Sequence, residues 1–123
     1  MIRAWLLAAA IAGFLSVAGG ALAAHLTEGG RSAELLRTGA LYGMVHAAAL
    51  VAVSAIARTR DRREYALIVA GWGFAVGMTV FSLSLFGLAL TGIAWLGLVT
   101  PLGGIGLFAG WAALGLYALR REG

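Results

Sequence analysis

The uncharged stretch "ALIVAGWGFAVGMTVFSLSLFGLAL", residues 66–90, decides the fold of this 123-residue chain. A helix of about 20 apolar residues crosses the roughly 30 Å hydrocarbon core of a bilayer, and this stretch is long enough to do so. A continuous apolar run of this length is typical of a helix, because buried strands seldom exceed about eight residues. The stretch therefore predicts a transmembrane helix.

Three further apolar runs, residues 4–24, 39–57 and 101–119, have similar length and are separated by charged and polar residues. Ser32 is a candidate N-cap for the second helix, and Thr100 followed by Pro101 is typical of a helix start. The predicted spans are 4–26, 33–57, 65–91 and 101–119. We therefore expect an all-α protein, an integral membrane antiparallel four-helix bundle that forms a single domain over residues 1–123.

The composition supports a membrane protein. Hydrophobic residues make up 62% of the chain and charged residues 11%. A soluble domain of this size has too little interior to bury that much apolar surface. The chain has no cysteine, which excludes disulfides, zinc–cysteine sites and cysteine nucleophiles. The formal charge of +4 comes with arginines at the ends of the apolar runs, so it indicates topology and not a nucleic-acid partner.

The arginines are unevenly divided between the two predicted sides of the membrane. Two lie in the first connection, Arg31 and Arg37, and the third connection has none. The other side carries seven: Arg3, Arg58, Arg60, Arg62, Arg63, Arg120 and Arg121. Because positive residues are enriched in cytoplasmic segments, both termini and the "RTRDRRE" loop, residues 58–64, are predicted to be cytoplasmic.

The first span has a second interpretation. It has a positive start, an apolar run and a cleavage-like Ala21-Leu22-Ala23, as in a signal peptide. The apolar run is longer than the roughly 7–15 residues of a signal peptide's apolar region, which favours a retained helix. Cleavage would leave three spans with the same cytoplasmic tail, so the charge rule does not separate the two alternatives.

Small residues recur at spacings of three, four and seven in each span, which keeps them on one side of a helix. Such stripes are typical of close helix–helix contact in membranes. The glycines predicted to pack helices are Gly13, Gly20, Gly43, Gly73, Gly77, Gly106 and Gly110.

His46 lies within the apolar second span. It shares a side of the helix with the small-residue stripe, so it is expected to point into the bundle. Counting about 1.5 Å per residue places it roughly 18 Å from the cytoplasmic end, near the level of Ser16 and Thr79, with Ser82 a turn higher. The predicted polar layer comprises His46, Tyr42, Ser16, Thr79 and Ser82. We expect His46 to bond a hydroxyl of Ser16, Thr79 or Ser82, either as a neutral packing residue or as a functional site.

His25 is a candidate outer-face site at the end of the first span. By the same count it lies some 13 Å above His46, too far along the axis for the two to share a haem iron. We predict no metal site, no catalytic residue and no bound cofactor, with haem or quinone as the alternative cofactors.

Four segments carry a resemblance to a known family: "AHL" (24–26), "YGMVHAAAL" (42–50), "FSLSLFGLALTG" (81–92) and "LGLVTPLGGIGLFAGW" (96–111). Together they resemble the small membrane proteins grouped as domain of unknown function 423, the YgdD-like and transmembrane protein 256-like proteins. Gly43 and Phe86 stand where the family pattern has glutamine and tyrosine. The resemblance implies a four-helix inner-membrane protein and implies no activity.

Three classes of function follow from these features. The first is an accessory or structural bundle of the cell inner membrane that binds lipids or a partner, as a homo-oligomer or within a larger membrane complex. The second is a small transporter or channel that uses the polar layer around His46. The third is a haem- or quinone-binding redox component. Because the spans contain no Asp, Glu, Lys or Arg between their ends, we expect a multi-pass protein that is not an enzyme.

Overall fold

The computed structural model describes residues 1–25 and 29–120, which form four helices. The helices are α1 (Ile2–His25), α2 (Gly30–Arg58), α3 (Tyr65–Thr91) and α4 (Leu96–Leu119). Each is long and apolar enough to cross a membrane. The prediction of an all-α protein with four spans is confirmed. Residue 26 of the first predicted span and Arg121 of the predicted cytoplasmic side lie outside the described residues.

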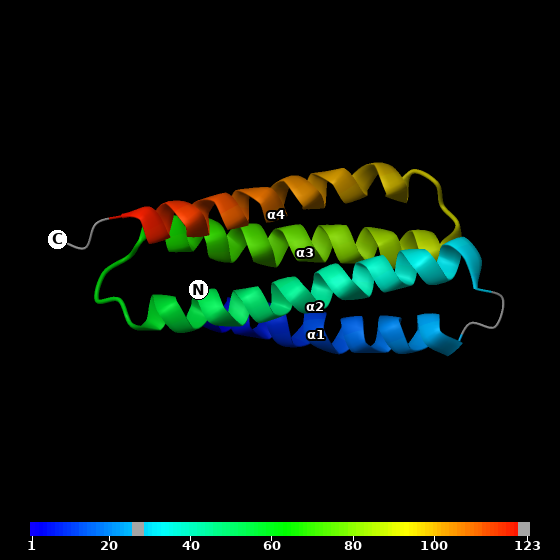
Figure 1. Ribbon diagram of the computed structural model, residues 1–123, viewed down its shortest axis with the longest axis horizontal. Coiled ribbons are helices and arrows are strands. Elements are labelled where there is room, and N and C mark those ends of the chain that lie inside the picture. Colours follow the sequence, from blue (N-terminus) through cyan, green and yellow to red (C-terminus); the bar gives the residue numbers. More distant parts are fainter. Residues whose placement is uncertain (26–28, 121–123) are drawn as a thin grey trace.

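The helices pack mainly on their neighbours in the sequence. α1 packs on α2, α2 on α3 and α3 on α4, whereas α1 touches α3 over a much shorter stretch. Figure 1 shows α4 and α1 at opposite edges of the bundle. The α2–α3 loop and the end of α4 lie at one end of the molecule, and the starts of α2 and α4 lie at the other end (Figure 1). α1 and α4 therefore each leave a broad outer face.

That outer surface is apolar. Phe14 of α1 is 75% exposed, and Leu98 and Phe108 of α4 are 77% and 79% exposed. Inside the bundle, by contrast, Trp5 and Phe74 are fully buried. A soluble protein rarely exposes so much contiguous apolar surface, whereas lipid tails cover it at no cost.

Glycines bring the backbones of α3 and α4 into direct contact. A Cβ added to Gly77 would lie 2.8 Å from the backbone nitrogen of Leu107 and 2.9 Å from the carbonyl oxygen of Gly103. Inside a membrane this close approach replaces the hydrophobic effect as the main source of helix association. We call the set the glycine seam, and its members are Gly73, Gly77, Gly103, Gly106 and Gly110.

The other glycines predicted to pack helices behave differently from one another. Gly43 of α2, one of the glycines predicted to pack helices, lies directly against the Ser16 hydroxyl of α1. A Cβ on Gly20 would meet only Ala40, at an ordinary 3.7 Å. Nothing lies within 4 Å of a Cβ on Gly13, so its predicted packing role is wrong. α1 packs closely on α2 alone, so fewer of its small residues meet a neighbouring helix.

Two helix starts differ from the predictions. α2 begins at Gly30 and not after Ser32, and its N-cap is Gly29, where Gly29 and Gly30 take positive φ angles of 56° and 72° that glycine adopts readily. α4 begins at Leu96, so Pro101 lies inside the helix and not at its first position. Leu96 packs against Gly87 of α3, which extends the helix toward its start.

The glycine seam yields a matched test on adjacent residues. Gly103→Ala places a methyl group against the backbone of Phe81 and 2.8 Å from the carbonyl oxygen of Gly77. We expect this variant to lose about 1–3 kcal/mol of unfolding free energy in detergent, as overpacked cores do. Gly104→Ala, which meets nothing within 4 Å, should be neutral or slightly more stable. Equal stabilities for the two variants would contradict the seam.

Candidate functional site

His46 uses both ring nitrogens in hydrogen bonds. Its Nδ1 lies 2.7 Å from the carbonyl oxygen of Tyr42, one turn earlier in α2. The indole Nε1–H of Trp111 donates to His46 Nε2 at 3.0 Å. A carbonyl oxygen only accepts, so Nδ1 carries the proton and Nε2 is the acceptor. The arrangement therefore fits a neutral imidazole that ties α2 to α4.

Aromatic rings surround the histidine. The His46 ring lies 5.8 Å from Trp111 and 5.7 Å from Phe74, and it stacks on Tyr42 at 6.0 Å between centroids. Tyr42 in turn lies 4.7 Å from Phe81. His46 is only 5% exposed. We call these five residues from α2, α3 and α4 the histidine cluster.

The predicted hydrogen bond from His46 to Ser16, Thr79 or Ser82 is wrong. Ser82 instead donates to the carbonyl oxygen of Gly39 at 2.8 Å. Thr79 donates to the carbonyl oxygen of its own helix one turn back, at 2.7 Å. The physical reason is that helix carbonyls offer hydroxyls a nearby acceptor, so they do not need the imidazole.

The expected polar layer is thus divided into two parts. His46 and Tyr42 belong to the histidine cluster, on the side of α2 that faces α3 and α4. Ser16, Thr79 and Ser82 line a separate groove between α1 and α3. Gly43 lies between the two parts, because the Ser16 and Ser82 hydroxyls both approach the position its Cβ would take.

Trp111 is the site residue that sequence reasoning missed. Its indole N–H requires an acceptor when it is partly buried, and a neutral histidine on a facing helix is a suitable one. By the depth count, Trp111 lies about one turn from the level assigned to His46, within reach of a long side chain. Matching indole donors to acceptors, and not hydroxyls alone, would have found the pair.

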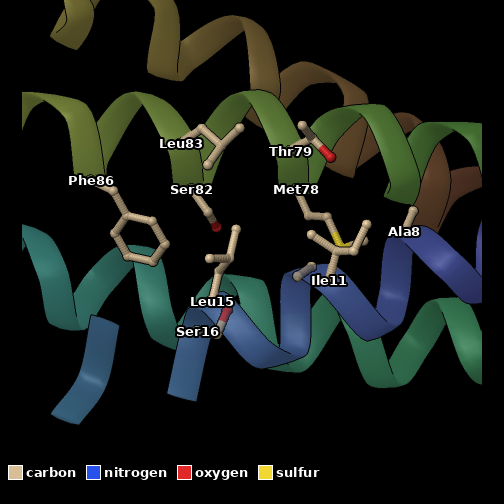
Figure 2. A pocket seen from close by; sticks show the side chains of 10 residues that line it. Ala8, Ile11, Leu15, Ser16, Met78, Thr79, Ser82, Leu83 and Phe86 are labelled. Carbon is tan, nitrogen blue, oxygen red and sulfur yellow. The ribbon is translucent and has the colours of Figure 1, made fainter. Parts of the chain in front are cut away.

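The groove between α1 and α3 has a volume of about 230 Å³. Figure 2 shows side chains from α1 and α3 that extend toward one another across it. It is lined by Ala8, Ile11, Ala12, Leu15 and Ser16 of α1 and by Met78, Thr79, Ser82, Leu83 and Phe86 of α3. Its two α3 hydroxyls are already bonded to helix carbonyls, so the groove presents mainly hydrocarbon to an occupant.

His25 lies apart from both sites. It is the last residue of α1 and is exposed, whereas His46 is about 24 Å along α2 from the start of that helix. Within residues 1–25 and 29–120, no three His, Cys, Asp or Glu side chains come together in a way that could hold a metal ion. An axial bond from His46 to haem iron would also require breaking one of its two hydrogen bonds.

The histidine cluster makes a testable pair. In a double-mutant cycle of His46→Phe and Trp111→Phe, we expect a coupling free energy of about 0.6–1.7 kcal/mol, typical of hydrogen bonds between membrane helices. Unfolding in mixed micelles measures the four stabilities. Trp95→Phe, at an exposed residue outside the cluster, is the control and should show no coupling with His46. Additive effects at His46 and Trp111 would be inconsistent with the bond.

Comparison with known proteins gives consistent matches over nearly the whole chain. The UPF0382 membrane protein YwdK of Bacillus subtilis is 32% identical over 122 residues, which cover 97% of this chain and 98% of that protein. The UPF0382 inner membrane protein YgdD of Escherichia coli K12 is 33% identical over 132 residues, covering 98% and 95%. No solved structure matches the chain.

The relatives are named as membrane proteins, one of them of the inner membrane, and the chain has four apolar helices of spanning length. It is accordingly a multi-pass protein of the cell inner membrane. A family model described as "Protein of unknown function (DUF423)" matches residues 19–104. The family resemblance of the sequence is thereby confirmed, and the chain belongs to the DUF423 family of small membrane proteins.

Proposed function

We propose that this protein is a non-catalytic lipid-binding bundle of the inner membrane, with antiparallel helices and both termini in the cytoplasm. Its groove between α1 and α3 would hold the acyl chain of a membrane lipid. The groove is the observation that carries the proposal, because it is apolar, lies between two membrane-spanning helices and is not filled by the protein's own side chains.

The groove suits the acyl chain of a lipid better than a polar solute. Ser82 and Thr79 have their hydroxyl protons engaged by carbonyl oxygens at 2.8 Å and 2.7 Å. A polar solute would find few free donors there, and leaving its own polar groups unpaired would be costly. Each methylene buried in such a site contributes about 0.8 kcal/mol relative to water, and a bilayer supplies chains at high local concentration.

The histidine cluster supports a packing role over transport or redox chemistry. A proton relay or a metal ligand needs a nitrogen that can change partners, and both nitrogens of His46 are held, by Tyr42 and by Trp111. His46 lies outside the groove, which is lined by α1 and α3. We therefore place transport, haem binding and quinone chemistry behind lipid binding.

The proposed orientation follows from charge. Arg3, Arg58, Arg60, Arg62 and Arg63 flank the ends of helices that gather at the end of the molecule with the α2–α3 loop. Arg31 and Arg37 lie at the start of α2, at the opposite end. Under the positive-inside rule the first group faces the cytoplasm.

Filling the groove tests the function. Ala12→Phe puts a ring into the groove, whereas Ala10→Phe puts the same ring on the exposed side of α1. The ring would displace at least about two methylenes of the acyl chain, and the loss of their burial weakens binding roughly tenfold. Ala12→Phe should therefore retain at least about tenfold less lipid than Ala10→Phe. Native mass spectrometry of protein released from nanodiscs measures the retained lipid.

Equal retention in the two variants would refute the groove as a lipid site. If Ala12→Phe instead releases a copurifying protein while lipid retention is unchanged, the accessory role works through a protein partner or a second copy. Both variants should unfold at similar temperatures, which separates loss of binding from loss of fold.

Orientation has its own test, and the absence of cysteine makes it simple. Thr59→Cys lies beside the α2–α3 loop and Ser32→Cys near the start of α2, and both positions are exposed. An impermeant maleimide added to intact spheroplasts should label Ser32→Cys and leave Thr59→Cys unlabelled until the membrane is opened. The reverse pattern would overturn the proposed orientation.

A further inference from the structure

A second pocket of about 230 Å³ lies at the end of the molecule that carries the α2–α3 loop. Its walls are the start of α1, with Ile2 and Trp5, the loop residues 60–64, and the first turn of α3, with Leu67 and Ile68. It therefore has an apolar floor and a charged rim, at the depth where a helix leaves the hydrocarbon core.

The rim is net positive. Arg60, Arg62 and Arg63 line it together with Asp61 and Glu64. Glu64 is already engaged, since its Oε2 accepts a bond from Arg120 at 2.9 Å and its Oε1 lies 3.9 Å from Arg62. The lining thus carries three arginines against two carboxylates, and Glu64 is shared with Arg120 from outside the lining, so Arg62 and Arg63 are the charges on which an anion site would depend.

Uncharged donors in the pocket point to the same ligand chemistry. Trp5 lines the pocket and is fully buried, yet its indole Nε1–H has no acceptor among the described residues. A buried donor without an acceptor is costly, so such groups commonly mark a missing partner. The start of α3 adds backbone N–H groups, because Glu64 at its N-cap makes no side-chain cap bond.

The pocket and the lipid groove lie along the same side of α1, with the contact of Trp5 on Gly71 between them. On α1 the lining runs from Trp5 through Ala8 and Ala12 to Ser16, at spacings of three and four that keep it on one side of the helix. The middle of the groove lies about ten residues along α1 from Ile2, or roughly 15 Å, which is half of a hydrocarbon core of about 30 Å. A lipid of the cytoplasmic leaflet spans that depth.

We propose that this pocket binds the phosphate of an anionic phospholipid headgroup whose acyl chain occupies the α1–α3 groove. The arginine rim supplies charge, the indole of Trp5 donates to a phosphate or ester oxygen, and the apolar floor holds the glycerol end of the chains. This assignment specifies which class of lipid the protein binds. Only the placement of the acyl chain in the groove rests on the proposed function.

Competitive lipid retention tests the headgroup assignment. Full-length protein is reconstituted in nanodiscs with equal phosphatidylglycerol and phosphatidylcholine, and native mass spectrometry gives the ratio retained. We expect the wild type to prefer phosphatidylglycerol. In the double variant Arg62→Gln/Arg63→Gln the retained ratio of phosphatidylglycerol to phosphatidylcholine should fall roughly tenfold. Arg31→Gln/Arg37→Gln makes the same charge change at the opposite end and should keep it.

Trp5→Phe examines the indole donor separately. It should lower the retention of both lipids by about threefold to tenfold, the range of one hydrogen bond to a charged group, and leave their ratio unchanged, because both lipids carry the same phosphate and ester oxygens. The unfolding temperature of the same samples separates loss of the hydrogen bond from damage to packing. Unchanged retention of both lipids would remove Trp5 from the site.

The outcomes separate the two proposals. No preference in the wild type, or equal loss in the two arginine pairs, overturns the headgroup site while leaving the groove intact. A preference that depends on Arg62 and Arg63, together with unchanged retention of both lipids in Ala12→Phe, overturns the groove and keeps the headgroup site. If glycerol 3-phosphate alone displaces phosphatidylglycerol at equal concentration, the pocket is a site for soluble phosphates, and the lipid assignment fails.

Discussion

Backbone contact between α3 and α4 is the constraint on which the rest of the structure depends. A Cβ on Gly73 would lie 2.9 Å from the carbonyl oxygen of Gly106, so no larger residue fits without separating the helices. Close approach also brings Trp111 of α4 beside Phe74 of α3, with ring centroids 4.9 Å apart, and from there its indole reaches His46 of α2. The glycine seam thus sets the distance between Trp111 and His46, whose bond is the only side-chain hydrogen bond between α2 and α4 found in the described residues.

The same arrangement explains why a groove exists. α2 and α3 are both fixed from two sides, whereas α1 is held chiefly by α2 and meets α3 closely only in part. Near its start, Trp5 lies against Gly71 and edge-on to Trp72, at 6.1 Å between ring centroids. Beyond that contact the helices leave room between Ala12 and Thr79. Within a bilayer such room is filled by lipid, because helices and lipid tails are equally apolar.

The sequence predicted four helices, their approximate bounds and most of the seam, because apolar length and glycine spacing act locally. It did not predict that a Cβ on Gly13 would meet no neighbouring helix, since the packing of α1 depends on how few neighbours it has. The predicted hydrogen-bond partner of His46 was also wrong. Counting residues along the helices ranks candidate partners by depth in the membrane, and it ignores that hydroxyls can bond helix carbonyls instead. The prediction that α4 starts at Pro101 was wrong as well. Packing of Leu96 on α3 outweighed the local preference of proline for a helix start.

Photo-crosslinking in living membranes tests the central claim, a lipid chain between α1 and α3, most directly. Cells supplied with a diazirine fatty acid incorporate it into their phospholipids, and peptide mapping locates the crosslinks. The account predicts crosslinks concentrated at Ile11, Leu15 and Leu83 of the groove, above the yield at Phe14 and Phe108, which are 75% and 79% exposed on the outer faces. A yield that simply follows exposure, highest at Phe14 and Phe108, would contradict it.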